Sequence, residues 1–288
     1  MKTIAILTDF SERAENAANY ALYLAQSLRA NLILYDAFLV PSASPLAAQV
    51  AWPMEDYGEL HAESEQELKA FAAKLRSKLT LYDDKTFKPD ISCQCHNGNL
   101  SVDMGELLAN KDLILLVMAN HEKSIASLLL GNHVHDLLDT TTLPLLIVRD
   151  HYAFQKLDNI AFATDLDATD IEVVRSLVSL AKPTMAKITL IHIGQANTDE
   201  NAVTKFMTEV SGKIDYPNIR YRKMTSSYIM DEVTGLDENN TYDMLVIVHR
   251  HKGFWEALFN QSDTQKMASQ IILPLLVYPY PAASLPVF

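Results

Sequence analysis

Apolar and polar positions follow one another along this chain in an order that occurs twice. Residues 4–9, "IAILTD", align without gaps with residues 160–165, "IAFATD", and the same alignment pairs Leu34 with Leu190. An internal repeat constrains the architecture more firmly than local propensity does. In each half a short apolar run, a Thr-Asp corner, a helical stretch and a second apolar run follow one another, which predicts a strand, a helix and a strand.

The two halves also end alike. The apolar runs 112–120, "DLILLVMAN", and 243–250, "DMLVIVHR", are short enough for buried strands. Each is followed by a helical stretch and then by a proline-led apolar run, "TTLPLLIVR" at 141–149 or "IILPLLVYP" at 271–279. Strands that are apolar throughout and alternate with helices indicate parallel sheets covered on both faces.

This pattern predicts two doubly wound α/β domains in tandem, over residues 1–150 and 156–280. We expect an approximate twofold axis to relate them, with the final strands "PLLIV" and "PLLVY" pairing at the centre, because an exposed apolar edge strand invites aggregation. The chain would then contain its own dimer. A homodimer of the whole chain is a further candidate assembly.

The middle of the first half differs from that of the second. A segment rich in Pro, Ala and Ser, residues 39–53, precedes a predicted helix at 55–79, whose counterpart in the second half is the shorter stretch 200–214. Long segments without regular periodicity are usually functional or disordered. We expect residues 38–53 to form a mobile lid or partner contact that limited proteolysis cuts first.

Composition excludes several classes of protein. The chain has 288 residues, 49% of them hydrophobic, and no stretch approaches the roughly 18–20 uncharged apolar residues of a membrane span. Asp9 comes too early for a signal-peptide core, so we expect a cytoplasmic protein without a membrane partner. The net charge of −12 disfavours nucleic acid as a partner, because the surface repels phosphate backbones on average.

Cysteines and histidines do not predict a metal site. On a strand, Cys93 and Cys95 point to the same face with too few partners for zinc, and we expect both thiols to be reduced and structural. On a helix, two histidines separated by one residue, as in "HVH" at 133–135, point about 200° apart. The "HRH" at 249–251 is freer, but solvent-exposed histidines or remnants of a phosphate site are favoured there.

No arrangement of side chains indicates catalysis. Serines with histidines nearby in sequence lack the Gly-x-Ser-x-Gly context of a nucleophile elbow, and proximity in sequence does not make a triad. We therefore predict no catalytic residue and expect that the protein is not an enzyme.

Three segments resemble the universal stress protein family, as a tandem two-domain member. They are "LTDFSERAENAANYAL" at 7–22, "ATDLDATDIEVVRSL" at 163–177 and "LLLGNHVHDLLDTTTLPLLIVR" at 128–149. The resemblance implies a five-stranded, mainly parallel, Rossmann-like sheet in each half, of the adenine nucleotide alpha hydrolase-like kind. It also implies a role in the cellular stress response.

One branch of this family binds ATP at the carboxyl ends of the parallel strands, where open α/β sheets commonly bind ligands. Carried over to this chain, the resemblance places the adenosine end at the corner after the first strand, adenine at the backbone after the second, and the phosphates along a loop before a helix. ATP or AMP is then the candidate ligand of the first half. The implied binding residues are Thr8, Asp9, Ala37, Ala119, Gly131 and Asn132.

The first half departs from the phosphate pattern of that branch, which is glycine, two residues, glycine, nine residues, glycine, then serine or threonine. Ala119 and Glu122 stand at the first two glycines, Gly131 comes one residue early, and Asn132 replaces the hydroxyl residue. A carboxylate at Glu122 would repel phosphates. The resemblance thus implies weaker nucleotide binding than in the intact branch.

The second half departs further. His249 and Lys252 stand at the first two glycines and Gln261 at the third, although Ser262 is retained. The adjacent pair at 254–255, "FW", would fill space that a triphosphate needs. Any nucleotide is therefore expected in the first half alone, with at most one molecule per chain.

Two functions are consistent with these departures. The first is a non-catalytic ligand-binding or scaffold module of the stress response, with degenerate nucleotide sites, that acts through protein partners. The alternative is an ATP- or AMP-binding member with slow nucleotide hydrolysis, which would need a positioned base and a metal-bound triphosphate. Asp9 and Asp165 are compatible with a ligand role or with capping of the helix that follows each.

Overall fold

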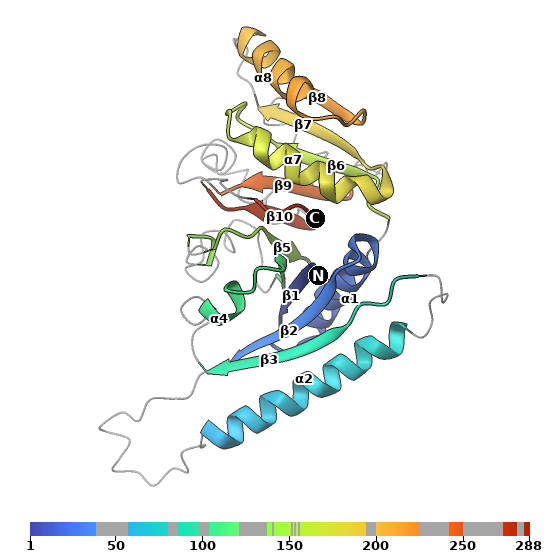
Figure 1. The fold of residues 1–288 in the computed structure, drawn as a ribbon, viewed down its shortest axis with the longest axis vertical. Helices are drawn as coiled ribbons and strands as arrows, with labels where there is room; N and C mark the ends of the chain where they lie inside the picture. The colour runs from blue at the N-terminus through green and yellow to red at the C-terminus, as the bar shows by residue number, and fades with distance from the viewer. Residues whose placement is uncertain are drawn as a thin grey trace, which may run out of the picture.

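Strands and helices alternate along the computed structural model of the chain (Figure 1). The structure describes residues 1–38, 57–79, 86–97, 104–120, 137–139, 141–150, 152, 154, 156–193, 200–224, 242–249, 273–280 and 285–288. The first half contains β1 (Thr3–Leu7), α1 (Glu12–Leu28), β2 (Asn31–Phe38), α2 (Tyr57–Leu79), β3 (Ile91–Asn97), α4 (Gly105–Leu108), β4 (Leu113–Ala119) and β5 (Leu145–Val148). The second half contains β6 (Asn159–Ala163), α7 (Asp170–Ala181), η2 (Lys182–Thr184), β7 (Lys187–Ile193), α8 (Glu200–Lys213), β8 (Ile219–Met224), β9 (Met244–Val248) and β10 (Leu275–Tyr278).

The ten strands that the structure describes form one sheet, in the order β3-β2-β1-β4-β5-β10-β9-β6-β7-β8. At its centre β5 and β10 pair antiparallel, with Leu146 opposite Leu276, whereas the other described strand pairs are parallel. The predicted pairing of the final strands is thus confirmed. The predicted α/β fold with a mainly parallel sheet is also confirmed, but the sheet is not split into two five-stranded sheets, because this pairing joins the strands of both halves. The domain bounds 1–150 and 156–280 stay a prediction.

Backbone geometry repeats between the halves as the sequence does. Phe10 and Leu166 have φ angles of 63° and 62°, and Arg29 and Met185 have φ angles of 54° and 57°. The left-handed region costs a non-glycine residue roughly 1–2 kcal/mol. Because the gap-free alignment pairs Phe10 with Leu166 and Arg29 with Met185, the two halves form the same corner and the same helix end.

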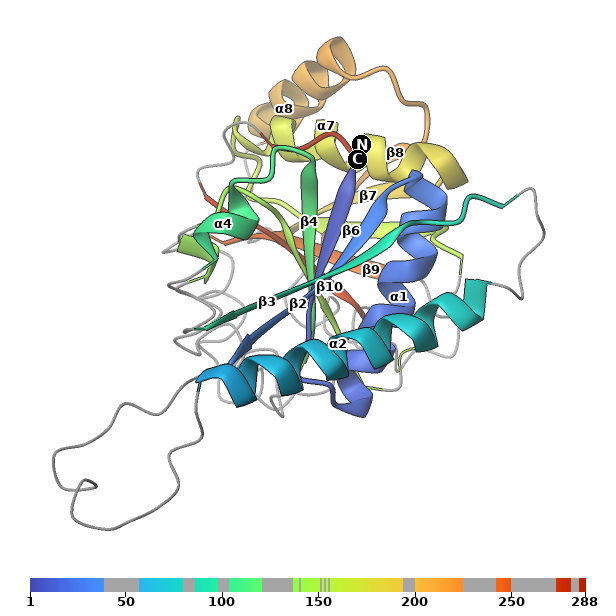
Figure 2. The ribbon, with the colours of Figure 1, turned by 60° about the horizontal axis from the view of Figure 1, so that its bottom comes forward.

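Each face of the sheet is covered by a core layer that runs through both halves. One layer contains buried side chains of α1, α2, α7 and α8 and alternate strand residues such as Ile4 and Phe162. The other contains the intervening residues such as Ala5 and Ala161, covered by α4 and residues 137–138. Alternation of side chains across a strand explains why neighbouring residues belong to different layers. Figure 2 shows α1 and α2 lying along the sheet near β1, β2 and β3.

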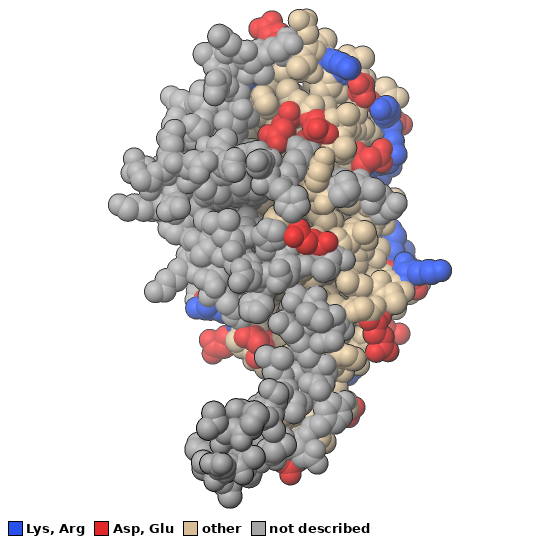
Figure 3. All heavy atoms as spheres, turned by 90° about the vertical axis from the view of Figure 1, so that its left-hand side faces the viewer, with Lys and Arg blue, Asp and Glu red and all other residues tan. Residues whose placement is uncertain are grey.

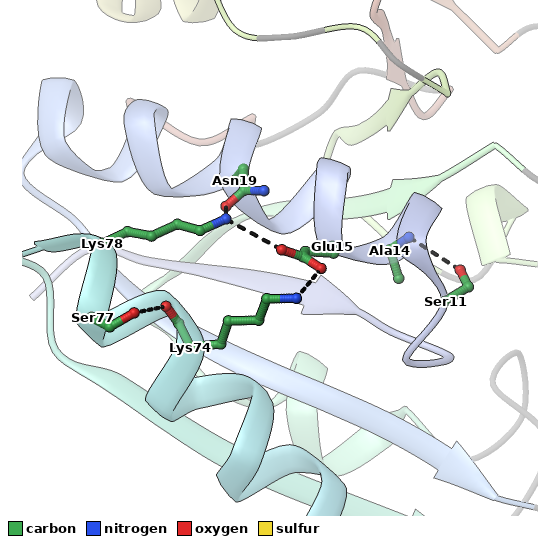
Figure 4. Close-up of polar contacts among 7 residues, drawn as sticks. All are labelled: Ser11, Ala14, Glu15, Asn19, Lys74, Ser77 and Lys78. Atoms are coloured by element: carbon green, nitrogen blue, oxygen red, sulfur yellow. Dashed lines mark hydrogen bonds and ion pairs between the residues drawn. The ribbon is translucent and has the colours of Figure 1, made fainter.

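Helices α1 and α2 are joined by one carboxylate. Lys74 and Lys78 of α2 donate to Glu15 of α1 at 2.5 and 3.3 Å, and Lys78 also donates to Asn19 Oδ1 at 2.7 Å (Figure 4). The hydrogen bond from Lys74 lowers the pKa of Glu15, and the charges of both lysines add to this effect. The contact fixes α2 beside α1 and so places α2 over β2 and β3.

The remaining predictions about elements have mixed outcomes. The helix expected at 55–79 begins at Tyr57, and the one expected at 200–214 ends at Lys213. Of the segment 38–53, only residue 38 lies within the described residues, so the predicted lid is not described. Among the helices that the structure describes, none is both long and apolar enough to span a bilayer.

Candidate functional site

The chain turns sharply where β1 ends. Thr8 is buried, its backbone N–H donates to Tyr35 O of β2 at 3.0 Å, and its Oγ1 accepts from Phe10 N at 3.0 Å. These bonds hold Phe10 in the left-handed conformation that reverses the chain toward α1. Asp9 is exposed at the carboxyl end of β1 as a result.

Ser11, rather than Asp9, caps helix α1. Ser11 Oγ accepts from Ala14 N at 3.2 Å (Figure 4), which satisfies one free N–H group of the first turn. Asp9 Oδ1 accepts from Ser11 N at 3.1 Å and from Ser11 Oγ at 2.7 Å. The carboxylate of Asp9 therefore orients the capping serine. The family resemblance assigns the same residue to ligand binding.

Asp36 lies at the carboxyl end of β2, and the sequence analysis did not single it out. Its side chain is buried, and Ser64 Oγ of α2 donates to its Oδ2 at 2.7 Å. Burial raises the pKa of Asp36, the hydrogen bond from Ser64 opposes this rise, and the charge of Asp9 adds to it. The detectable signal was a lone acidic residue in the otherwise apolar strand "NLILYDAF".

The carboxyl ends of β2, β1 and β4 lie side by side. In the register, Leu7 stands opposite Tyr35 on one side and Met118 on the other. The structure therefore brings together four predicted residues at the carboxyl ends of these strands: Thr8, Asp9, Ala37 and Ala119. The other two predicted residues, at 131 and 132, lie outside the described residues.

Negative charge is present on this side of the molecule. Strands β2, β3 and β7 point toward the left of Figure 1, and Figure 3 looks onto that side. Acidic side chains lie among the described residues on this face (Figure 3). Lysine and arginine side chains are visible in the same view, so a phosphate group would meet repulsion next to the acidic side chains in particular.

In the corner of the second half, polar side chains bind one another. Thr164 Oγ1 accepts from Leu166 N at 2.9 Å, as Thr8 does in the first corner, and it also donates to the buried Asp170 Oδ2 at 2.6 Å. His192 occupies the place of Asp36, and its Nδ1 donates to Thr164 O at 3.0 Å. Asp165 is exposed, like Asp9. The two corners thus share a backbone but differ in side-chain chemistry.

Strand register corrects one alignment of the sequence analysis. His249 N donates to Tyr278 O at 2.7 Å as Asn120 N donates to Val148 O at 2.9 Å, so the equivalent of Ala119 is residue 248, and not His249 as predicted. The pairing of β1 with β4 changes register between Thr3 and Ile4. The described pairing of β6 with β9 runs without such a change.

That equivalent residue is a valine, Val248. Its side chain is bulkier than that of Ala119, and both side chains are buried in the same core layer. His249, which follows, lies with its Nε2 3.7 Å from Asp139 Oδ1 of the first half.

Replacing Asp36 with asparagine is expected to change the pH dependence of stability. Because the pKa of Asp36 is raised in the folded state, the native protein binds this proton more tightly than the unfolded chain does. Asp36 therefore makes its full contribution to stability below the ordinary pKa of aspartate. This contribution is lost as the pH rises through the raised pKa of the folded state. In Asp36→Asn the amide oxygen can still accept from Ser64, so this loss should disappear.

Urea unfolding of both proteins between pH 3 and pH 7 measures the effect. The variant should be at least as stable as the wild type at pH 7, and its stability should fall less than that of the wild type as the pH rises through this range. A wild-type profile in Asp36→Asn would contradict the assignment.

Comparison with known proteins agrees with this architecture. A family model described as the universal stress protein family matches residues 1–149. The solved structure of a universal stress protein from Archaeoglobus fulgidus DSM 4304 is 15% identical, with 96% of each chain covered and a TM-score of 0.61. A protein from Pseudomonas aeruginosa UCBPP-PA14 that is assigned to the same family is 14% identical, with 97% of this chain and 93% of that chain covered and a TM-score of 0.54.

A third similar structure is the cytoplasmic domain of a prokaryotic cation chloride cotransporter. It is 7% identical, with 99% of this chain and 97% of that chain covered and a TM-score of 0.56. No curated protein matches the chain in sequence. At these identities the structural similarities establish the fold alone.

Proposed function

Since the chain belongs to the universal stress protein family, we propose that it is a non-catalytic ligand-binding or scaffold module of the cellular stress response. Its two nucleotide sites are degenerate, and the first half holds the single remaining ligand position, at the carboxyl ends of β1, β2 and β4. We also place the protein in the cytoplasm.

The difference between the two strand-end sites carries this proposal. In the first half the small Ala119 ends β4 next to the strand that leads into the exposed Asp9. In the second half the larger Val248 stands at the equivalent position, and His192 bridges the ends of β6 and β7 through Thr164. The strand ends of the second half are therefore bridged by a side chain, and this difference favours the first half as the ligand position.

The chemistry of the first site favours a ligand with hydroxyl groups and little negative charge. Asp9 and Asp36 are both acidic, and carboxylates accept hydrogen bonds from hydroxyls such as those of ribose. The same carboxylates repel phosphate groups. Among adenine nucleotides the site should therefore prefer AMP to ATP, and a site that holds ATP weakly is poorly suited to its hydrolysis.

Calorimetric titration of the purified chain with AMP and with ATP tests the proposal. We expect at most one nucleotide per chain, tighter binding of AMP than of ATP, and no phosphate release from ATP. Two nucleotides per chain, or turnover of ATP, would overturn it. Absence of binding of both nucleotides would overturn the nucleotide assignment and leave the scaffold role.

Matched variants of the two corners locate the site. In Asp9→Asn the amide oxygen can still accept from Ser11, but one carboxylate oxygen is lost as an acceptor for the ligand. Loss of a charged hydrogen bond should weaken AMP binding by about tenfold to a hundredfold. The control Asp165→Asn alters the equivalent exposed residue of the second corner and should leave the affinity unchanged. Equal effects of the two substitutions would contradict a site in the first half.

The scaffold part of the proposal concerns protein partners. Pairing of β5 with β10 covers one edge of each half within the chain, so β3 and β8 are the outer edges of the sheet. Strand β8, "IRYRKM", carries three basic residues, which protect an edge against pairing with another strand. Strand β3, "ISCQCHN", has no lysine or arginine, so we place a partner or a second copy of the chain at this edge.

A further inference from the structure

A cluster of three different metal-ligating side chains lies where helix α2 crosses the edge strand β3. His61 and Glu65 are one helical turn apart in α2, and Cys95 is in β3. We propose that these three residues bind a divalent transition metal ion, with Zn²⁺ the best match. Cys95 adjoins Asp36 in the strand register, but none of the three ligands is among the residues proposed to bind nucleotide, so the proposal does not depend on that function.

The distances within the cluster suit one shared ion. His61 Nε2 lies 3.4 Å from Cys95 Sγ, and ligand atoms of all three residues lie within 4.8 Å of one another. In a tetrahedral zinc site the nitrogen lies at about 2.0–2.1 Å and the sulfur at about 2.3 Å from the metal, which separates the two ligand atoms by roughly 3.5 Å. The imidazole and the thiol are therefore already spaced as two ligands of one ion.

The helix presents its two ligands together. Residues four positions apart in a helix lie on the same face, so His61 and Glu65 both meet β3 on one side of α2. Helix α2 is fixed against the sheet at its other end by the lysine contacts to Glu15 and by a hydrogen bond from Arg76 to Ile91 O of β3. The position of the ligands thus depends on the packing of a long helix rather than on a loop.

The set of ligands favours zinc over the hard cations. An imidazole nitrogen, a thiolate sulfur and a carboxylate oxygen are ligands that Zn²⁺ accepts together. Magnesium and calcium prefer oxygen ligands alone. Glu65 also accepts from Lys69 at 2.6 Å, and because this ion pair is exposed it is too weak to exclude a metal ion.

A cavity beside the cluster leaves room for a fourth ligand. Its volume is about 250 Å³, and it is lined by all three proposed ligands together with residues such as His96 and Glu106. Three protein ligands with one open position are typical of zinc sites that bind water or an exogenous ligand. We therefore infer a fourth position that is occupied by water and is open to small donors.

Cys93 provides a matched control. It lies on the same strand two residues from Cys95 and is also a free thiol, but its Sγ donates to Leu68 O at 3.5 Å. In the sequence the two cysteines look alike, and neither has enough neighbouring ligands for zinc. The structure distinguishes them, because His61 and Glu65 of a distant segment lie beside Cys95.

Titration of the chelator-stripped full chain with Co²⁺ tests the proposal, because Co²⁺ substitutes for Zn²⁺ and shows a charge-transfer absorption when bound to thiolate. We expect one Co²⁺ per chain, with this band, and displacement by one equivalent of Zn²⁺. Cys95→Ser should abolish the band, and His61→Ala should weaken Zn²⁺ binding by roughly tenfold or more. Cys93→Ser should keep both the band and the affinity.

Circular dichroism of each variant verifies that the fold is retained. Failure of the wild type to bind Co²⁺ with a thiolate band would overturn the proposal. Persistence of the band in Cys95→Ser, or its loss in a folded Cys93→Ser, would overturn the assignment of the ligands.

Discussion

Replacing Leu276 with alanine is expected to lower the free energy of unfolding by about 2–5 kcal/mol, and replacing it with aspartate to prevent folding. Leu276 lies in β10 at the centre of the ten-stranded sheet, opposite Leu146 of β5, and both side chains are buried. Truncation leaves a cavity at the pairing of the two halves. An aspartate at this position would bury a charge without solvation by water.

Urea unfolding followed by circular dichroism measures this loss. The exposed Val287 is a control, and Val287→Ala should change stability by no more than about 0.5 kcal/mol. Because both core layers run through the two halves, Leu276→Ala should shift a single transition to lower urea. A transition confined to the second half, with the first half unaffected, would contradict one continuous sheet.

Tyr20→Ala is expected to destabilise the protein by about 3–5 kcal/mol. Tyr20 of α1 is buried, and its ring lies 4.9 Å from that of Phe154 in an edge-to-face contact and 6.3 Å from that of Tyr152. Residues 152 and 154 lie in the segment that connects the two halves. The same connection is held by Asn16, whose Nδ2 donates to Tyr152 O at 3.1 Å.

Tyr23 is the matched control for this substitution. Its ring stacks on the same Phe154 at 5.0 Å, but it is exposed, so Tyr23→Ala should cost only about 1 kcal/mol. Thermal unfolding of the two variants compares them directly. Equal losses in the two variants would show that the buried contact is not what fixes the connection.

The repeat was predictable because similar residues recur in the same order in both halves. Matching positions such as Thr8 and Thr164 form the same hydrogen bond to the residue two positions on, and the apolar final runs pair as expected. The continuous sheet follows from that pairing, although a five-stranded sheet was expected in each half. Periodicity indicates which strands exist, whereas only their packing shows where one sheet ends.

The site was less predictable, for physical reasons. Ala119 was placed correctly at a strand end, but its counterpart was misassigned by one residue, because a register shift between β1 and β4 does not appear in hydrophobic patterning. Asp36 and His61 were missed for a different reason. Their roles depend on the side of α2 that faces the sheet, which brings Ser64 to Asp36 and His61 to Cys95 across large distances in sequence.

Hydrogen–deuterium exchange of the full chain, with and without saturating AMP, tests most directly the central claim that ligand binding is confined to the first half. The account predicts slower exchange in peptides that contain residues 8–11 and 36–37, where Asp9 and Ala37 lie at adjacent strand ends. It predicts no change at residues 164–167, the equivalent corner of the second half. Protection of both corners, of the second corner alone, or of neither would contradict the account.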